Sequence, residues 1–223
     1  MMVRSVSTCD IVLVGVGGQG ILTIGEILLH AALESDVAAS FAPTKGMAQR
    51  GGFVKAELRL GRDGVGPRIG EGAADLVLAT ERSEALRGIR FVKPGGVFIL
   101  YDDVWAPTGV MLGAAKYPER EAVVAAINEA GARSVVLLPS EIPPINGRPA
   151  AANIVVLGAA CAVPALARAL DALVVERIVA ARWPKSAAPN VEAFRVGLEA
   201  AGCASRMGFG ESREPQPRAD RRG

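Results

Sequence analysis

Residues 11–20 read IVLVGVGGQG, an apolar run that passes into a segment with four glycines in six positions. An apolar run bounded by glycine predicts a central strand that is covered on both faces. Residues 20–35 then carry apolar side chains at helical spacing, which predicts a helix. The stretch therefore predicts a strand, a tight turn and a helix, the opening unit of an α/β domain.

Short apolar runs and amphipathic stretches alternate through the first two thirds of the chain. Further strands are predicted at residues 37–41, 75–79, 97–101 and 134–138, and helices at residues 83–91 and 119–130. Residues 53–60, FVKAELRL, alternate apolar and polar side chains, which is typical of a half-exposed strand. GRDG at 61–64 is a turn sequence, so this strand is predicted to pair antiparallel with a neighbour. We therefore predict a three-layer α/β/α fold with a mixed, mostly parallel sheet.

From about residue 153 onward the pattern is helical, which predicts a C-terminal helical cluster. Helices are expected at 153–170, 171–182 and 190–201, with Asp171 and Asn190 as N-caps. The last stretch is polar, contains proline and lacks apolar periodicity, so a disordered tail is predicted. The expected organisation is an N-terminal lead at 1–9, one domain at 10–205 and a tail at 206–223.

Composition excludes several classes of protein. The chain has 223 residues, half of them hydrophobic, and a formal net charge of +2. This charge is too small to indicate binding to nucleic acid. Cys9, Cys161 and Cys203 are far apart, so neither a disulfide framework nor a cysteine-ligated cluster or zinc site is expected. Reduced thiols of this kind are typical of a cytoplasmic protein.

No segment is expected to cross a membrane. The N-terminus is polar and carries no signal peptide. Residues 151–170 are long enough by count to span a bilayer, but they include Asn153, Pro164 and Arg168. They are rich in alanine rather than leucine, so they are predicted to form a buried helix of a soluble core.

The glycine turn satisfies the G-x-G-x-x-G pattern through Gly15, Gly17 and Gly20. Missing side chains let an anion approach the backbone, and the following helix offers free amides. A dinucleotide fold also needs an acidic residue at the end of the second strand. Here Glu34 and Asp36 precede that strand, and Ala-Pro-Thr-Lys follows it. A dinucleotide, another anion, a partner segment and a merely tight turn all remain open.

Two further residues of the turn are candidates for contact with a ligand or subunit. Gly18 adds freedom to the turn, and Gln19 places an amide that can donate and accept at its mouth. The side chain of Gln19 is expected either to line a pocket or subunit contact, or to lie in solvent.

A second glycine-rich loop, TKGMAQRGG at 44–52, is the most distinctive segment. If residues 37–41 run parallel to the first strand, this loop leaves the same carboxyl edge of the sheet, where ligands of open α/β sheets collect. The planar guanidinium of Arg50 can pair with a phosphate or carboxylate. Its candidate site residues are Lys45, Gly46, Met47, Gln49, Arg50, Gly51 and Gly52.

Four segments, in order, resemble the gamma-type domain of 2-oxoacid:ferredoxin oxidoreductases. They read VGVGGQGILTIGEIL, PTKGMAQRGGFVKAELRLG, ADLVLA with FVKPGGVFILYD, and NIVVLGAA. The resemblance covers residues 10–202, and GVGGQG together with GMAQRGG is a specific pair. The GMAQRGG form is most similar to members of the indolepyruvate type, in which the preceding residue is more commonly histidine than the Lys45 found here.

The resemblance implies an enzyme complex that oxidatively decarboxylates a 2-oxoacid, with coenzyme A as acyl acceptor and ferredoxin as electron acceptor. It places thiamine diphosphate, Mg²⁺ and iron–sulfur clusters in a larger partner subunit, and no cofactor or catalytic residue in this chain alone. The residues that match the family pattern would contact substrate, coenzyme A or another subunit. They are Gly15, Gly17, Gly18, Gln19, Gly20, Lys45, Gly46, Met47, Gln49, Arg50, Gly51, Gly52 and Asn153.

Three interpretations are therefore carried forward. The first is a subunit that completes the site of a 2-oxoacid:ferredoxin oxidoreductase and is inactive alone. The alternatives are a stand-alone NAD(P)-binding oxidoreductase and a pure interaction module. Asn153 matches a recurring asparagine of the gamma-type domain, and it is expected either to cap its helix or to form a hydrogen bond into the site.

Overall fold

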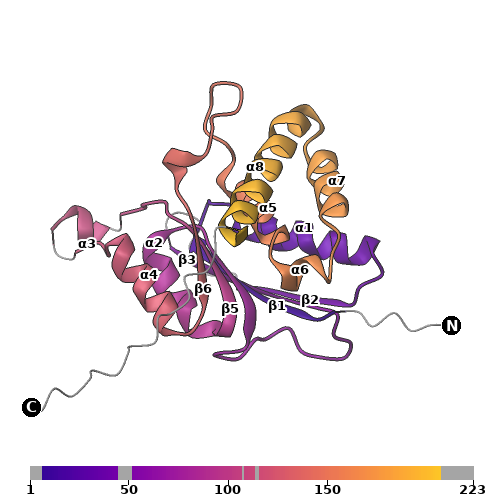
Figure 1. Cartoon of the computed structure of the whole chain (residues 1–223), viewed down its shortest axis with the longest axis horizontal. Coiled ribbons are helices and arrows are strands. Elements are labelled where there is room, and N and C mark those ends of the chain that lie inside the picture. Colours follow the sequence, from indigo (N-terminus) through magenta and orange to yellow (C-terminus); the bar gives the residue numbers. More distant parts are fainter. Residues whose placement is uncertain (1–6, 45–51, 107, 114–115, 207–223) are drawn as a thin grey trace, which may run out of the picture.

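One mixed sheet forms the centre of the molecule (Figure 1). The computed structural model describes residues 7–44, 52–106, 108–113 and 116–206. Within them, six strands lie in the order β2-β3-β1-β4-β5-β6. Their bounds are β1 Cys9–Val16, β2 Ala39–Thr44, β3 Phe53–Leu60, β4 Ala74–Ala79, β5 Val92–Tyr101 and β6 Arg133–Leu137.

The strand directions confirm a mixed, mostly parallel sheet. β1, β4, β5 and β6 pair in parallel, whereas β3 pairs antiparallel with both β1 and β2. Since β1 and β2 are both antiparallel to β3, they run in the same direction. The second glycine-rich loop therefore starts at the carboxyl edge of the sheet, as predicted. Residues 45–51 of that loop lie outside the described residues.

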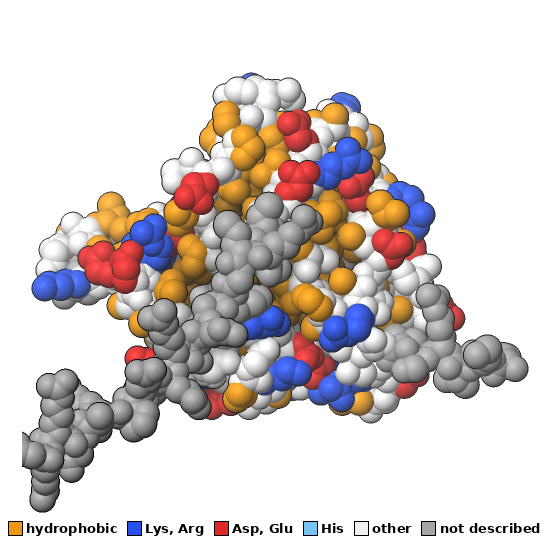
Figure 2. Space-filling model, viewed as in Figure 1, with side chains coloured by type: hydrophobic (Ala, Val, Ile, Leu, Met, Phe, Trp, Pro, Cys, Tyr) orange, Lys and Arg blue, Asp and Glu red, His pale blue; other side chains and the backbone are white. Residues whose placement is uncertain are grey.

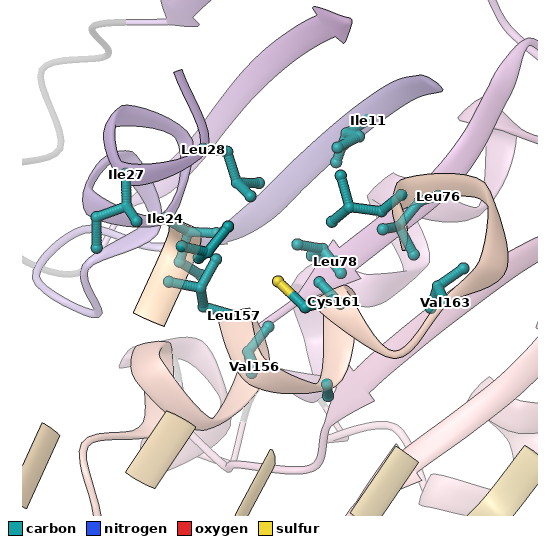
Figure 3. Close-up of a cluster of buried hydrophobic side chains, with 14 of the residues drawn as sticks. Ile11, Ile24, Ile27, Leu28, Leu76, Leu78, Val156, Leu157, Cys161 and Val163 are labelled. Carbon is teal, nitrogen blue, oxygen red and sulfur yellow. The ribbon is translucent and has the colours of Figure 1, made fainter. Parts of the chain in front are cut away.

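Helices cover both faces of the sheet, as the three-layer prediction required (Figure 1). The first face packs against α1 and the C-terminal helices, and the second packs against α2 and α4. Alternate residues of β1 point to opposite faces, Ile11 and Leu13 to the first and Val12 and Val14 to the second. Figure 3 shows the first cluster, in which Leu28 of α1 and Leu157 of α5 lie beside the strands. The helix bounds are α1 Ile21–Glu34, α2 Arg82–Gly88, α3 Thr108–Met111, α4 Arg120–Glu129, α5 Ala152–Cys161, α6 Pro164–Ala167, α7 Ala172–Arg182 and α8 Ala187–Arg206.

The C-terminal helices differ from the prediction in two places. The prediction of a single helix at 153–170 is wrong, because α5 ends at Cys161 and α6 begins at Pro164. The fixed φ and missing N–H of proline suit the first turn of a helix. The capping role of Asn190 is also wrong, since α8 already begins at Ala187. Asp171 does cap α7, accepting a hydrogen bond from Leu173 N at 2.9 Å.

The helix α8 packs closely on α5 through two glycines. A Cβ at Gly158 would lie 1.9 Å from Phe194 O, and a Cβ at Gly197 would lie 1.9 Å from Val155 O. The two backbones therefore approach more closely than any larger residue allows. None of the helices in the described ranges has the length and apolar content needed to span a bilayer. Of the tail predicted at 206–223, Arg206 is the last residue of α8 and the rest falls outside the described ranges.

Candidate functional site

The glycine turn joins the end of β1 to the start of α1. Gln19 N donates to Val16 O at 3.1 Å, which closes the turn. Gly18 and Gly20 have φ values of 103° and 75°, in the left-handed region that residues with a side chain rarely adopt. Gly20 occupies the N-cap position of α1, which therefore has no side-chain cap. Two of the four glycines are thus required by backbone conformation.

Close neighbours explain Gly15 and add a second reason for Gly20. A Cβ at Gly15 would lie 2.2 Å from the hydroxyl of Thr80, and a Cβ at Gly20 would lie 2.4 Å from Asn153 Nδ2. The helix α5 begins at Ala152, and its N-cap residue makes no side-chain cap. The expectation that Asn153 caps its helix is therefore wrong, and its side chain instead lies against the glycine turn.

Gln19 connects three segments that follow different strands. Its Oε1 accepts hydrogen bonds from Val16 N at 3.0 Å and from the Thr80 hydroxyl at 2.8 Å. Its Nε2 donates to Asp103 Oδ2 at 3.4 Å. The side chain of Gln19 therefore lines a pocket rather than lying in solvent, because residues at the ends of β1, β4 and β5 hold it.

These residues surround a pocket of about 280 Å³ at the carboxyl edge of the sheet. β1 lies between β3 and β4 in the sheet. The helix α1, which follows β1, covers one face of the sheet, and α2, which follows β4, covers the other. Such switch points are where open α/β sheets bind ligands. The pocket is lined by Gly18, Gln19, Gly20, Thr80, Asp103, Ala152 and Asn153.

The pocket brings together several of the residues that the sequence singled out. Gly17 lies beside it and donates from its N–H to Gly52 O at 2.9 Å, which joins the first glycine loop to the end of the second. Lys45, Gly46, Met47, Gln49, Arg50 and Gly51 lie outside the described residues. The candidate site residues predicted from the sequence did not include Thr80, Asp103 and Ala152, which also line the pocket. Thr80 directly follows an apolar strand, DLVLA, and that position is the signal that identifies it.

The charge around the pocket is negative within the described residues. Asp103 is the charged side chain among those that line it. The neighbouring Arg82 is already paired, because it binds both carboxylate oxygens of Asp102 at 2.6 and 2.9 Å, and this pairing raises its pKa. The described lining therefore suits neutral hydrogen-bonding groups better than a phosphate.

The sheet order argues against the dinucleotide interpretation. In a dinucleotide-binding fold the second strand is the parallel neighbour of the first, and its end carries the acid that binds the ribose. Here β3 lies between β1 and β2 and runs antiparallel to both. The position beside the glycine turn is therefore occupied by Gly52, at the start of β3.

A buried carboxylate holds the loops after β4 and β5 together. Glu81 is fully buried and accepts hydrogen bonds from the amides of Glu84 and Trp105, at 2.8 and 3.3 Å. It also accepts from the hydroxyls of Ser83 and Tyr117. Burial and the bond to Glu81 raise the pKa of the Tyr117 hydroxyl. This network makes the edge of the sheet beside the pocket rigid.

The described residues do not fit a metal ion or an iron–sulfur cluster. They contain no group of three or more His, Cys, Asp or Glu side chains close enough to hold one. Cys9 and Cys161 are both buried and free, and burial is the main cause that raises the pKa of each thiol to about 12. A thiol that keeps its proton is a poor metal ligand.

A doubly wound α/β domain with a polar pocket at its switch point is an architecture in which ligands commonly bind. Residues 10–200 match the family described as pyruvate ferredoxin/flavodoxin oxidoreductase. The chain belongs to this family.

Two relatives carry the same name. The chain is 40% identical over 149 residues to the indolepyruvate oxidoreductase subunit IorB of Archaeoglobus fulgidus, covering 67% of this chain and 74% of the relative. It is 35% identical over 193 residues to the IorB subunit of Pyrococcus horikoshii, covering 86% of this chain and 95% of the relative.

Solved structures share the fold. The pyruvate oxidoreductase subunit PORC of Thermotoga maritima aligns with a TM-score of 0.63 and 20% identity, over 86% of this chain and 96% of that one. The 2-oxoglutarate:ferredoxin oxidoreductase of Magnetococcus marinus, solved with 2-oxoglutarate, coenzyme A and succinyl-CoA bound, aligns with a TM-score of 0.65 and 18% identity. That alignment covers 88% of this chain but only 31% of the other.

Proposed function

We propose that this chain is the smaller, gamma-type subunit of an indolepyruvate-type 2-oxoacid:ferredoxin oxidoreductase. The observation that carries the proposal is the family match over residues 10–200, together with relatives named as subunits of that enzyme at 35–40% identity. The complex would convert a 2-oxoacid and coenzyme A to an acyl-CoA and CO₂, with release of a proton. Two molecules of ferredoxin would each take one of the two electrons released.

The cofactors belong to the larger partner subunit. Thiamine diphosphate with Mg²⁺ would supply the carbanion chemistry there, and iron–sulfur clusters would carry electrons to ferredoxin. The donor set of the described residues supports this division, since the buried thiols of Cys9 and Cys161 retain their protons. The complex would work in the cytoplasm, and the chain alone would be inactive.

The pocket at the glycine turn would hold part of coenzyme A beside the partner's active site. Thr80 and Asn153 offer neutral donors and acceptors, and Gly18, with open space beside it, lets a ligand approach the backbone closely. Such groups suit the amides of the pantetheine arm, whereas Asp103 repels a phosphate. Lys45 and Arg50 are the basic residues that we assign to the phosphates. The remaining candidates, which would shape or frame the two loops, are Gly15, Gly17, Gln19, Gly46, Met47, Gln49, Gly51 and Gly52.

The test is reconstitution with the larger subunit under anaerobic conditions. The wild-type complex should reduce ferredoxin in a reaction that requires an aryl 2-oxoacid and coenzyme A. Failure of the tagged chain to recover a thiamine-binding, iron–sulfur partner would contradict the proposed function. Tight binding of NADH by the isolated chain would favour a stand-alone oxidoreductase instead.

The assignment of the pocket has its own test. Asn153→Ala should raise KM for coenzyme A and leave KM for the 2-oxoacid unchanged, since the side chain lines the pocket. Asp171→Asn is the matched control, because Asp171 caps α7 and keeps that role as asparagine. Equal changes in both KM values, or none, would refute the coenzyme A assignment.

A further inference from the structure

Exposed hydrophobic side chains gather on the segment that follows β5. Val104 is 49% exposed, Trp105 53%, Met111 76% and Leu112 78%. Most large hydrophobic side chains elsewhere in the described ranges are in one of the two core clusters. Large apolar side chains left in water are typical of a protein interface, and tryptophan and methionine are enriched at interfaces.

The base of this segment is held in place. Arg82 N donates to Asp103 O at 3.0 Å, and Trp105 N donates to the buried carboxylate of Glu81 at 3.3 Å. Glu81 in turn accepts from Tyr117, on the other side of α3 in the sequence. Hence a hydrogen bond holds the backbone at Trp105, and about half of the residue's surface is exposed to solvent. A preorganised apolar anchor loses little conformational entropy on binding.

The segment lies next to the pocket and next to a second apolar hollow. Asp103, which begins the segment, also lines the pocket at the glycine turn. The hollow lies between α4 and the outer strand β6, with Val124, Val136 and Leu138 in its lining. Arg120 lines the hollow and approaches Asp102 to 3.8 Å, so the two features meet at the end of β5. Figure 2 shows hydrophobic side chains beside charged ones at this end of the molecule.

We infer that the larger, thiamine-binding subunit of the same complex docks on the exposed side chains of Val104, Trp105, Met111 and Leu112. The inference rests on the proposed function and names the face through which the subunits meet. In the Magnetococcus marinus protein this fold accounts for 31% of one longer chain, so there it is continuous with further protein of the same enzyme. A partner seated on Trp105 would lie beside the pocket and would close it on the side of Asp103.

Substitution of Trp105 and Met111 tests the proposed docking surface directly. The tagged chain carrying Trp105→Ala with Met111→Ser should bind the larger subunit at least about tenfold more weakly than wild type, the loss typical of interface hot spots. Leu33→Ser and Leu173→Ser are the matched controls. These side chains are 66% and 72% exposed, and they lie on α1 and α7, on the opposite side of the sheet from α4. The controls should bind within about twofold of wild type, and all variants should keep the wild-type melting temperature.

Hydroxyl-radical footprinting of the assembled complex provides a second measurement without mutation. Trp105 and Met111 should be oxidised readily in the isolated chain and protected in the complex, whereas Leu33 and Leu173 should react equally in both. Wild-type binding by the double variant, or unprotected Trp105 in the complex, would overturn the docking surface and leave the proposed function standing. If wild type recovers no larger subunit, the proposed function fails. A self-association of the isolated chain that Trp105→Ala abolishes would assign the surface to a second copy and overturn the inference.

Discussion

The α5–α8 crossing and the turn after β1 both depend on glycine, but for different reasons. At the crossing, Gly158 and Gly197 each face the backbone of the other helix at a distance that admits no Cβ. At the turn, Gly15 faces the side chains of Thr80 and Ile21, Gly20 faces that of Asn153, and Gly18 faces open space. Backbone in a packed core cannot move aside, whereas a side chain at a pocket can. Glycine therefore preserves stability at the crossing and the shape of the site at the turn.

The largest expected effect is at the crossing. Gly158→Ala should lower the free energy of unfolding by about 3 kcal/mol, the upper end of the usual cost of overpacking, because the backbone of α8 cannot move aside. Chemical denaturation measures the loss. Gly202→Ala, in the same pair of helices but with no atom within 4 Å of its Cβ, is the control and should be neutral or slightly stabilising. A small loss for Gly158→Ala would contradict the role assigned to the crossing.

At the turn, the loss of stability should be smaller and the loss of ligand binding larger. Gly20→Ala places a side chain at φ 75°, which should cost about 1–2 kcal/mol of stability, and it also displaces Asn153. Gly72→Ala introduces similar strain at φ 66° with open space around it, so it separates strain from the effect on the pocket. Only Gly20→Ala should raise KM for coenzyme A in the reconstituted complex. Equal KM values for the two variants would show that the pocket does not depend on Gly20.

Gln19 tests the connection between the three segments around the pocket. Gln19→Leu keeps the size of the side chain but removes its bonds to Val16 N and to the Thr80 hydroxyl. The free energy of unfolding should fall by about 1–2 kcal/mol, the cost of leaving two partly buried groups unsatisfied. Hydrogen exchange of the Val16 amide should accelerate as well. An unchanged exchange rate would mean that the side chain does not hold the turn.

The N-cap of α7 should have a modest effect on stability and none on ligand binding. Asp171→Ala removes the acceptor for Leu173 N and should lower the free energy of unfolding by about 1 kcal/mol. Asp171→Asn preserves the acceptor and should lie within a few tenths of a kcal/mol of wild type. Any change in KM for coenzyme A with either variant would argue against a purely structural role for this cap.

The buried thiols should leave the free energy of unfolding unchanged at neutral pH and should lower it increasingly at alkaline pH. The pKa of Cys161 rises from 9.0 to about 12 on burial, so the unfolded chain loses this proton at a lower pH than the folded protein. The free energy of unfolding should therefore be independent of this group below pH 9 and should fall between pH 9 and 12. The slope should be shallower in Cys161→Ala, whatever that variant costs in absolute stability. Equal slopes would contradict the burial of a protonated thiol.

Local patterns were sufficient for much of the fold. The apolar run and glycines at 11–20 predicted β1, its turn and α1, because strand and helix periodicity are properties of neighbouring residues. The alternation at 53–60 likewise predicted β3. Boundaries were less accurate, as at the break after Cys161, where a single proline decides between one long helix and two short ones.

The site could be predicted only in part. Gly18, Gln19 and Gly20 follow from the motif, since a glycine turn after a strand lies at the edge where pockets form. Thr80 and Ala152 come from distant segments, and no local pattern pairs them with the turn. Asn153 was assigned to the site by family resemblance, but its contact with Gly20 depends on how α5 packs beside α1.

The sequence by itself determined the strand–turn–helix unit, the mixed sheet and the family, because these depend on periodicity, turn residues and motifs that can be read along the chain. Only the tertiary structure decided that β3 lies between β1 and β2, which removes the place for a dinucleotide ribose. It also decided that the side chains of Gln19, Thr80, Asp103 and Asn153 share one pocket. These features depend on contacts between distant segments, and packing selects such contacts only when the whole core assembles.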